Sequence, residues 1–251
     1  MKLFALSAAL VCAALDAMQL KLRKNLTLPE RNKWQTKWSQ RILRALNIQV
    51  LFQGFPPTKG MLVTNHLSYL DIMAISYVLP STFLSKAEVQ KWPFIGLLTQ
   101  FAGTLFVRRE RKSDLHALTK AFSDVWKQDS IIVMFPEGTS SDGDAILPFK
   151  SSLLKPACDE SQLITPAHLR YDCEDGDLKE DVYFWKDMTF APHLLRLLST
   201  RSVKASITFG EPRSAENQDR KQLTQSLWQD IHEMHERSLE ERNKQRHRGN
   251  E

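Results

Sequence analysis

Cysteine is scarce in this sequence: Cys12, Cys158 and Cys173 are the only three in 251 residues, and none shares a C-x-x-C spacing. So small and odd a number argues against a disulfide-stapled secreted domain and favours a reducing compartment. Long apolar runs are missing too, because no stretch approaches the ~18 uninterrupted apolar residues of a membrane span. With a mean hydropathy of -0.35, the chain is not expected to be a polytopic membrane protein.

Two kinds of catalytic signature are also missing. The sequence has no G-x-S-x-G nucleophile motif, and its seven histidines do not cluster at metal-ligand spacing. We therefore expect neither a serine hydrolase nor a metal site, and no cofactor. What is present is a globular composition, with 42% hydrophobic and 25% charged residues, in a chain long enough for one large domain.

Positive charge is concentrated at the N-terminus. Residues 1–44 hold nine basic and two acidic side chains, a net charge of +7, whereas the whole chain carries +5. A nucleic-acid-binding domain more often carries its basic patch on the folded body, so we expect no nucleic-acid partner. A basic segment beside apolar residues points instead to an anionic membrane surface.

Residues 3–15 form a 13-residue apolar run directly after Met1 and Lys2. Three interpretations are open: the core of a signal peptide, a short buried helix, or a helix that lies in one leaflet of a membrane. No clean small-x-small cleavage site follows the run, and the basic flank favours the leaflet interpretation.

The next segment predicts an amphipathic helix, in which Pro29 suits the first turn and Thr27 is a candidate cap. Its apolar residues recur every four positions: Trp34, Trp38, Ile42 and Leu46. Tryptophan on one side and lysine or arginine on the others is typical of an interfacial helix. We therefore expect residues 1–47 to be a membrane-associating helical segment. The same periodicity also suits an ordinary amphipathic helix that caps a domain.

From residue 48 onward, short runs rich in valine, isoleucine and phenylalanine alternate with helical stretches. The predicted strands are 48–53, 60–64, 82–85, 104–108, 130–135, 163–169 and 203–209. The predicted helices between and after them include 70–79, 88–101 and a charged surface helix over 215–243. This alternation predicts an α/β fold, with a mostly parallel central sheet flanked by helices, in a single domain over residues 48–251.

Chemically distinctive residues follow three of the predicted strands. In parallel sheets the site usually lies at the carboxyl ends of the strands. Asn65 and His66 follow the second strand, and Asp71 comes five residues later, a spacing that can orient an imidazole for general-base work. Arg109 follows the fourth strand, and Glu137 follows the fifth, fixed between a proline and a glycine.

These groups match the sequence blocks of a known family. The three blocks N-H-x-x-x-x-D, G-x-x-F-x-x-R and F-P-E-G-T-x-S contain Asn65, His66, Asp71; Gly103, Phe106, Arg109; and Glu137, Gly138, Thr139. A fourth block, a proline after a hydrophobic strand, is represented by Pro166. On these residues the chain resembles the glycerolipid acyltransferases typified by 1-acylglycerol-3-phosphate acyltransferase.

The resemblance implies a mechanism. His66 would take a proton from an acceptor hydroxyl as it attacks an acyl thioester, either acyl-CoA or acyl carrier protein, and Asp71 would hold the imidazole and stabilise its charged form. Arg109 would bind the acceptor's phosphate through its guanidinium fork, with Lys150 as a second contact. The implied substrate-binding set is Asn65, Gly103, Phe106, Arg109, Glu137, Gly138, Thr139 and Lys150.

Two features leave the acceptor open. Family members usually carry arginine where this chain has Ser140, and residues 184–193 resemble bacterial members that acylate lyso-ornithine lipid. The implied acceptor is therefore 1-acylglycerol-3-phosphate, giving phosphatidic acid, or lyso-ornithine lipid or another lyso-lipid. A catalytically inactive membrane-binding homologue is the alternative of another class, and the intact His66, Asp71 and Arg109 favour the enzyme. We expect it at the membrane, on the cytoplasmic face of the inner or plasma membrane.

Overall fold

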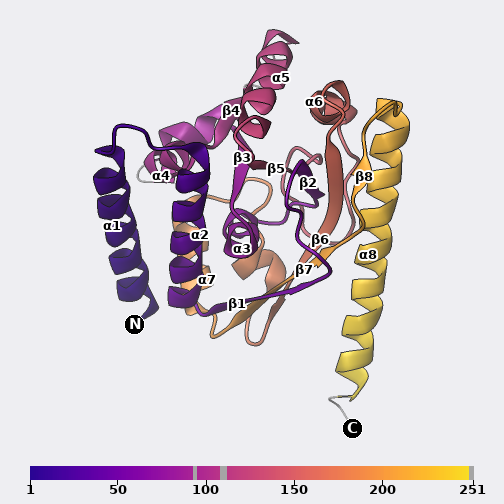
Figure 1. The fold of residues 1–251 in the computed structure, drawn as a ribbon. Coiled ribbons are helices and arrows are strands. Elements are labelled where there is room, and N and C mark those ends of the chain that lie inside the picture. The colour runs from indigo at the N-terminus through magenta and orange to yellow at the C-terminus, as the bar shows by residue number, and fades with distance from the viewer. Residues whose placement is uncertain (93–94, 108–111, 249–251) are drawn as a thin grey trace.

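The computed structural model describes residues 1–92, 95–107 and 112–248, and places a sheet at the centre with helices on both of its faces (Figure 1). The strands are β1 (Ile48–Gln53), β2 (Met61–Thr64), β3 (Ser81–Lys86), β4 (Leu105–Val107), β5 (Ile131–Met134), β6 (Leu163–Cys173), β7 (Val203–Phe209) and β8 (Arg213–Ser214). Their order is β1-β7-β6-β2-β5-β3-β4, with β8 paired to β6. Only the pairings of β6 with β7 and β8 are antiparallel among those described, which confirms the predicted mostly parallel α/β sheet.

Eight α-helices accompany these strands in the described part of the chain. They are α1 (Lys2–Lys21), α2 (Leu28–Ala45), α3 (Leu70–Val78), α4 (Ile95–Ala102), α5 (Lys112–Trp126), α6 (Lys155–Asp159), α7 (Phe190–Ser199) and α8 (Arg220–Arg248). Short turns of 3₁₀ or π geometry lie at η1 (Ala87–Lys91), η2 (Ser151–Leu154) and η3 (Leu178–Val182). The single helix predicted over residues 88–101 is therefore wrong, because η1 precedes a separate α4.

Strand β2 shows how the layers are held together. All four of its residues are buried, and they alternate between two hydrophobic cores on opposite faces of the sheet. Leu62 packs in the core that α2, α3 and α7 cover, whereas Met61 and Val63 pack in the core that α5, α6 and α8 cover. A strand buried on both faces is apolar throughout, which is why this run reads as continuously hydrophobic.

The N-terminal helices pack against each other and against the body. Helix α2 begins as predicted, since Thr27 and Glu30 form a reciprocal capping box and Pro29 occupies the first turn. The prediction that its tryptophans face a membrane is wrong, because Trp34 and Trp38 are buried. The Trp34 ring meets Phe101 of α4 edge-on at 4.8 Å, and Trp38 Nε1 donates to Asp16 of α1 at 2.7 Å. The apolar stripe of α2 therefore holds α1 and α4 in place, as a helix that caps the domain does.

Helix α1 has two different sides. Its inner side, which includes Leu6, Ala13 and Ala17, is buried against the protein. Its outer side exposes large apolar residues at helical spacing, and we call this set the outer face of α1: Leu3, Phe4, Val11, Leu15, Met18 and Leu22. By length and composition alone, α1 is the one helix among the described residues that could cross a membrane, and a signal sequence near an N-terminus would pass the same test.

Candidate active site

Four neighbouring parallel strands, β2, β5, β3 and β4, end at the same edge of the sheet. Strand β2 runs into Asn65 and His66, and strand β5 runs into the Phe135–Glu137 segment. Because β2 and β5 are adjacent, the first and third sequence blocks come together at this edge. Strand β4 ends at Val107, shortly before Arg109, which lies outside the described residues.

His66 and Asp71 are joined directly. His66 Nδ1 lies 2.7 Å from Asp71 Oδ2, and the aspartate is fully buried while the histidine side chain is 22% exposed. A carboxylate oxygen accepts, so Nδ1 is the nitrogen that carries hydrogen. That leaves Nε2 to accept a proton at the partly open side of the ring. Phe135 stacks on the imidazole with ring centroids 4.2 Å apart, which restricts the rotation of the ring.

Asp71 is held on all sides. It lies in the first turn of α3, and its Oδ2 also accepts the amide N–H groups of Leu67 at 2.7 Å and Ser68 at 3.0 Å. Its Oδ1 accepts the hydroxyl of Tyr171 at 2.8 Å. A buried carboxylate is tolerated only when donors compensate for the lost water, and these donors supply that compensation. Sequence reasoning missed Tyr171, which belongs to none of the four blocks.

Glu137 supports the backbone beneath the histidine. Its Oε1 accepts the amide N–H of His66 at 3.0 Å, and the side chain is only 3% exposed. Burial raises its pKa to about 8; the N–H donated by His66 opposes this rise, and the charge of nearby Asp71 adds to it. The third block thus touches the first block through a buried glutamate.

Asn65 is also turned into the protein. Its Nδ2 donates to the carbonyl of Leu169 at 2.9 Å, and its Oδ1 accepts the amide N–H of Leu169 at 2.8 Å. Both ends of this buried amide are therefore occupied by strand β6. The side chain ties the end of β2 to its neighbour and fixes the starting point of the loop that carries His66.

The other predicted site residues occupy different positions around this edge. Gly138 has a φ of 77° in the turn after β5, and Thr139 beside it is exposed. Lys150 is exposed as well, and its backbone N–H donates to the carbonyl of Pro136 at 2.9 Å, which places it beside the third block. Gly103 and Phe106 lie in or just before β4, three places from β2 in the strand order.

Residues 184–193, which resemble the segment of members that acylate lyso-ornithine lipid, lie against the histidine loop. The amide N–H of Phe184 donates to the carbonyl of Leu67 at 2.9 Å, and the Ser140 hydroxyl bonds to the carbonyl of Phe184. From the loop, Tyr69 reaches into a cluster of rings within residues 184–193, and its hydroxyl lies 3.1 Å from His193 Nδ1. Residues 184–193 therefore form a wall directly behind the His66 loop.

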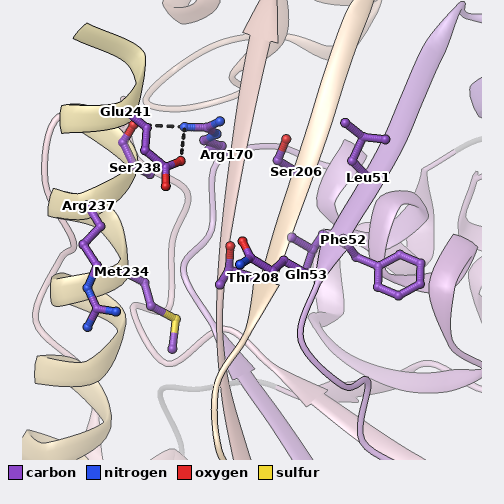
Figure 2. Close-up of a pocket in the computed structure, with 11 residues that line it drawn as sticks. Leu51, Phe52, Gln53, Arg170, Ser206, Thr208, Met234, Arg237, Ser238 and Glu241 are labelled. Atoms are coloured by element: carbon purple, nitrogen blue, oxygen red, sulfur yellow. Dashed lines mark hydrogen bonds and ion pairs between the residues drawn. The ribbon is translucent and has the colours of Figure 1, made fainter. Parts of the chain in front are cut away.

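A groove in the described structure lies away from these residues. It has a volume of about 280 Å³ and runs between α8 and strands β1 and β7, lined by residues such as Phe52, Thr208 and Met234 (Figure 2). None of His66, Asp71 or Glu137 lines it. The candidate site is therefore defined by side-chain geometry at the sheet edge and not by this groove.

A histidine oriented by a buried aspartate, at the carboxyl edge of an α/β sheet, is the arrangement of an enzyme that uses imidazole as a general base. Comparison with known proteins identifies which enzymes these are. The profile of the family described as Acyltransferase matches residues 48–170. A lyso-ornithine lipid O-acyltransferase of Pseudomonas aeruginosa is 32% identical over 204 residues, covering 81% of this chain and 78% of the relative. The chain belongs to this acyltransferase family, and it is an acyltransferase enzyme.

Two further similarities agree with that assignment. A 1-acyl-sn-glycerol-3-phosphate acyltransferase of Neisseria meningitidis is 31% identical over 206 residues, covering 80% of this chain and 80% of the relative. The crystal structure of PlsC, the 1-acyl-sn-glycerophosphate acyltransferase of Thermotoga maritima, superimposes with a TM-score of 0.65. That match covers 95% of this chain and 98% of the other at 17% identity, so it shows a shared fold.

Proposed function

We propose that this enzyme moves a fatty acyl group from an acyl thioester to the free hydroxyl of a lyso-lipid. The acceptor proposed first is 1-acylglycerol-3-phosphate, which gives phosphatidic acid, the reaction after which the Neisseria meningitidis relative is named. The observation that carries the proposal is the 2.7 Å contact between His66 and the buried Asp71 at the sheet edge.

In the proposed reaction, His66 Nε2 takes the proton from the acceptor hydroxyl. The acceptor oxygen attacks the thioester carbonyl and forms the new ester bond as the carbon–sulfur bond breaks. The imidazolium returns its proton to the departing sulfur, which leaves as a thiol. Asp71 keeps Nδ1 protonated and stabilises the imidazolium while it holds that proton. A thiol with a pKa of ~8.5 is a good leaving group that needs little acid assistance. The acceptor oxygen attacks the thioester directly, so the proposed reaction uses no covalent acyl-enzyme and no cofactor. The donor is acyl-CoA or acyl carrier protein.

Of the remaining site residues, two are proposed to position the His66 loop and the others to contact the substrate. Asn65 and Glu137 are buried and bonded to the backbone of the site, so they position the His66 loop. Arg109 and Lys150 supply the cationic groups for the acceptor's phosphate. The turn at Gly138, with the exposed Thr139 next to it, lines the place of the acceptor's glycerol, and Gly103 and Phe106 shape the β4 side.

A lyso-ornithine lipid is the second candidate acceptor. The Pseudomonas aeruginosa relative is named for it, and its 32% identity to this chain is similar to the 31% of the Neisseria meningitidis relative. Ser140, whose hydroxyl bonds to the Phe184 carbonyl, supplies no cation to a phosphate. The wall of residues 184–193 behind the His66 loop is then the part of the site that would contact the ornithine head group.

We further propose that the enzyme sits on the cytoplasmic face of an anionic membrane through the outer face of α1. An exposed apolar stripe of this size on a helix is a surface for lipid or protein. The net charge of +7 over residues 1–44 favours an anionic lipid surface, to which each basic residue contributes up to about 1 kcal/mol. The buried inner side of α1 would keep the helix parallel to the surface.

A substrate panel tests the proposed function. Purified full-length protein in detergent is offered 1-acylglycerol-3-phosphate, lyso-ornithine lipid and lysophosphatidylethanolamine, each with acyl-CoA and with acyl carrier protein. We expect transfer to 1-acylglycerol-3-phosphate, and the lipid with the highest kcat/KM identifies the natural head group. A preference for lyso-ornithine lipid would replace the first acceptor by the second. Failure to acylate any acceptor with either donor would support an inactive membrane-binding homologue.

A further inference from the structure

Asp71 receives hydrogen bonds on both of its oxygens, from different directions. Oδ2 faces the loop, where His66 Nδ1 and the amides of Leu67 and Ser68 surround it. Oδ1 points to strand β6, where the hydroxyl of Tyr171 donates to it at 2.8 Å. Since the three donors on Oδ2 all come from residues 66–68, Tyr171 is the donor that fixes Asp71 to the sheet.

The Tyr171 hydroxyl stays neutral, so it acts on Asp71 as a hydrogen-bond donor. Its side chain is fully buried, and burial together with the Asp71 charge raises its pKa well above the usual value. The phenol therefore keeps its proton throughout the range in which the enzyme works. A neutral hydroxyl that donates to a buried carboxylate shares the negative charge and holds the plane of the carboxylate.

The backbone of Tyr171 is itself clamped by the C-terminal helix. Arg242 of α8 donates to the carbonyl of Tyr171 at 2.7 Å and pairs with Asp172 at 3.1 Å. One residue earlier, Arg170 donates to the carbonyl of Ser238 at 2.9 Å, and Figure 2 shows this bond between β6 and α8. Helix α8 thus fixes the part of β6 from which the tyrosine reaches Asp71.

We infer that Tyr171 is a positioning residue of the acyl transfer, the third member of a hydrogen-bonded chain Tyr171–Asp71–His66. It acts through Asp71 by sharing the carboxylate's charge and by holding Oδ2 in line with His66 Nδ1. This role rests on the proposed general-base function of His66. Without the hydroxyl, Oδ1 loses its donor, Oδ2 is held in line with Nδ1 less rigidly, and more of the carboxylate's charge acts on the imidazolium.

The test compares Tyr171→Phe with a matched control, Tyr183→Phe. Tyr183 is also buried, and its ring lies 6.3 Å from that of Tyr171, but its hydroxyl lies near Arg242. For Tyr171→Phe we expect kcat to fall about tenfold while both Michaelis constants stay within about twofold, because the lost bond acts on the base and not on binding. For Tyr183→Phe we expect kcat within about twofold of the unaltered enzyme.

The pH dependence of kcat/KM separates positioning from general packing. In Tyr171→Phe the acid side of the profile should move to higher pH, because a less shared Asp71 charge holds the proton on the imidazolium more tightly. Among the described residues, the other titratable or charged groups near this hydrogen-bonded chain include Glu137 from the β5 turn, Tyr69 from the loop, Tyr183 from the segment after η3 and Arg242 from α8. All of them are unchanged in the variant. An unmoved profile with an unchanged kcat would overturn the inference, and so would equal losses in the two tyrosine variants.

Two further measurements keep the inference testable if Tyr171→Phe folds poorly. Fluorotyrosine at position 171 keeps the shape and strengthens the donated bond, so the acid side of the profile should move to lower pH. In an Asp71→Asn background, Tyr171→Phe should lower the residual kcat less than twofold, because the chain is already broken. A full tenfold loss in that background would show that Tyr171 acts elsewhere. An unaltered enzyme that transfers no acyl group would overturn the proposed function, whereas an active enzyme insensitive to these changes would overturn only the role of Tyr171.

Discussion

Replacing Glu137 by glutamine should change how the stability of the protein depends on pH. The glutamine keeps the shape of the side chain and an oxygen that can accept the His66 amide, but it cannot titrate. In the folded protein, burial raises the pKa of Glu137 to about 8, against an ordinary value of 4.5. The carboxyl therefore holds its proton in the folded state over a range of pH in which the unfolded chain has already lost it.

The sign of the effect follows from this difference in bound protons. The folded state binds more protons than the unfolded state between pH 4.5 and about 8, so the free energy of unfolding falls as pH rises through that window. The stabilisation that comes from the proton on Glu137 is fully present below pH 4.5, the pKa in the unfolded chain. It is lost above about pH 8, the pKa in the folded protein. One proton corresponds to about 1.4 kcal/mol per pH unit, so the loss between pH 5 and 8 is on the order of 3–4 kcal/mol.

The assay is urea unfolding of the unaltered protein and of Glu137→Gln at several pH values from 5 to 8. The unfolding free energy of the unaltered protein minus that of Glu137→Gln should fall by several kcal/mol as pH rises over this range, because every other titrating group is common to both. Glu216→Gln, at an exposed position, is the matched control and should follow the unaltered protein. Parallel stability curves for Glu137→Gln and the unaltered protein would refute the inference that Glu137 is protonated in the fold.

Three other predictions concern the acceptor, the β4 turn and the membrane. Arg109→Ala should raise the Michaelis constant for a phosphate-bearing lyso-lipid more than that for the donor, and a rise in the donor constant alone would assign Arg109 to the donor. Gly103→Ala should lower the unfolding free energy by about 1–3 kcal/mol, because Gly103 has a φ of 88° and an added Cβ would lie 2.4 Å from Leu28 Cδ1. An unchanged melting temperature would contradict that strain. Glutamate at Phe4, Val11 and Leu15 should release the protein from anionic vesicles in a co-sedimentation assay without loss of folding. The same number of glutamates at the polar exposed positions Ser7, Gln19 and Asn25 should weaken binding less. Retention of the Phe4, Val11 and Leu15 variant at high salt would exclude the outer face of α1 as the contact.

Much of the fold could be predicted from the sequence because its strands are short runs of β-favouring residues between turns, and β2 and β5 are buried on both faces. Strands β1 and β7 begin and end at the predicted residues. Strand β2 begins one residue later than predicted, and β5 is one residue shorter at each end. Short apolar runs between turns have few other structures available to them. The helix predicted over 88–101 failed because η1 is a 3₁₀ helix that ends at Lys91, and Trp92 after it has extended backbone.

The tryptophan stripe of α2 shows the limit of periodicity. An apolar stripe predicts that one side of a helix is covered, but whether a membrane or another helix covers it depends on the tertiary structure. Here α1 and α4 cover Trp34 and Trp38, and the exposed apolar side belongs to α1 instead.

Two kinds of contact in the candidate site could be predicted: contacts within the first block, and the meeting of blocks at neighbouring strand ends, as between His66 and Glu137. Asp71 is five residues after His66, so their contact follows from local spacing once α3 begins at Leu70. The contact between Asp71 and Tyr171 joins residues 100 positions apart. It depends on β6 being the neighbour of β2, which the sequence pattern does not specify.

Acyl transfer in the proposed mechanism depends on His66 as the general base. The decisive measurement is the turnover of His66→Ala with the best acceptor of the panel, together with thermal melting. We expect a kcat at least about a hundredfold lower, because a positioned base contributes ~10²–10⁴-fold, with a melting temperature close to that of the unaltered protein. A folded His66→Ala enzyme that keeps its turnover within about tenfold would remove His66 from the mechanism.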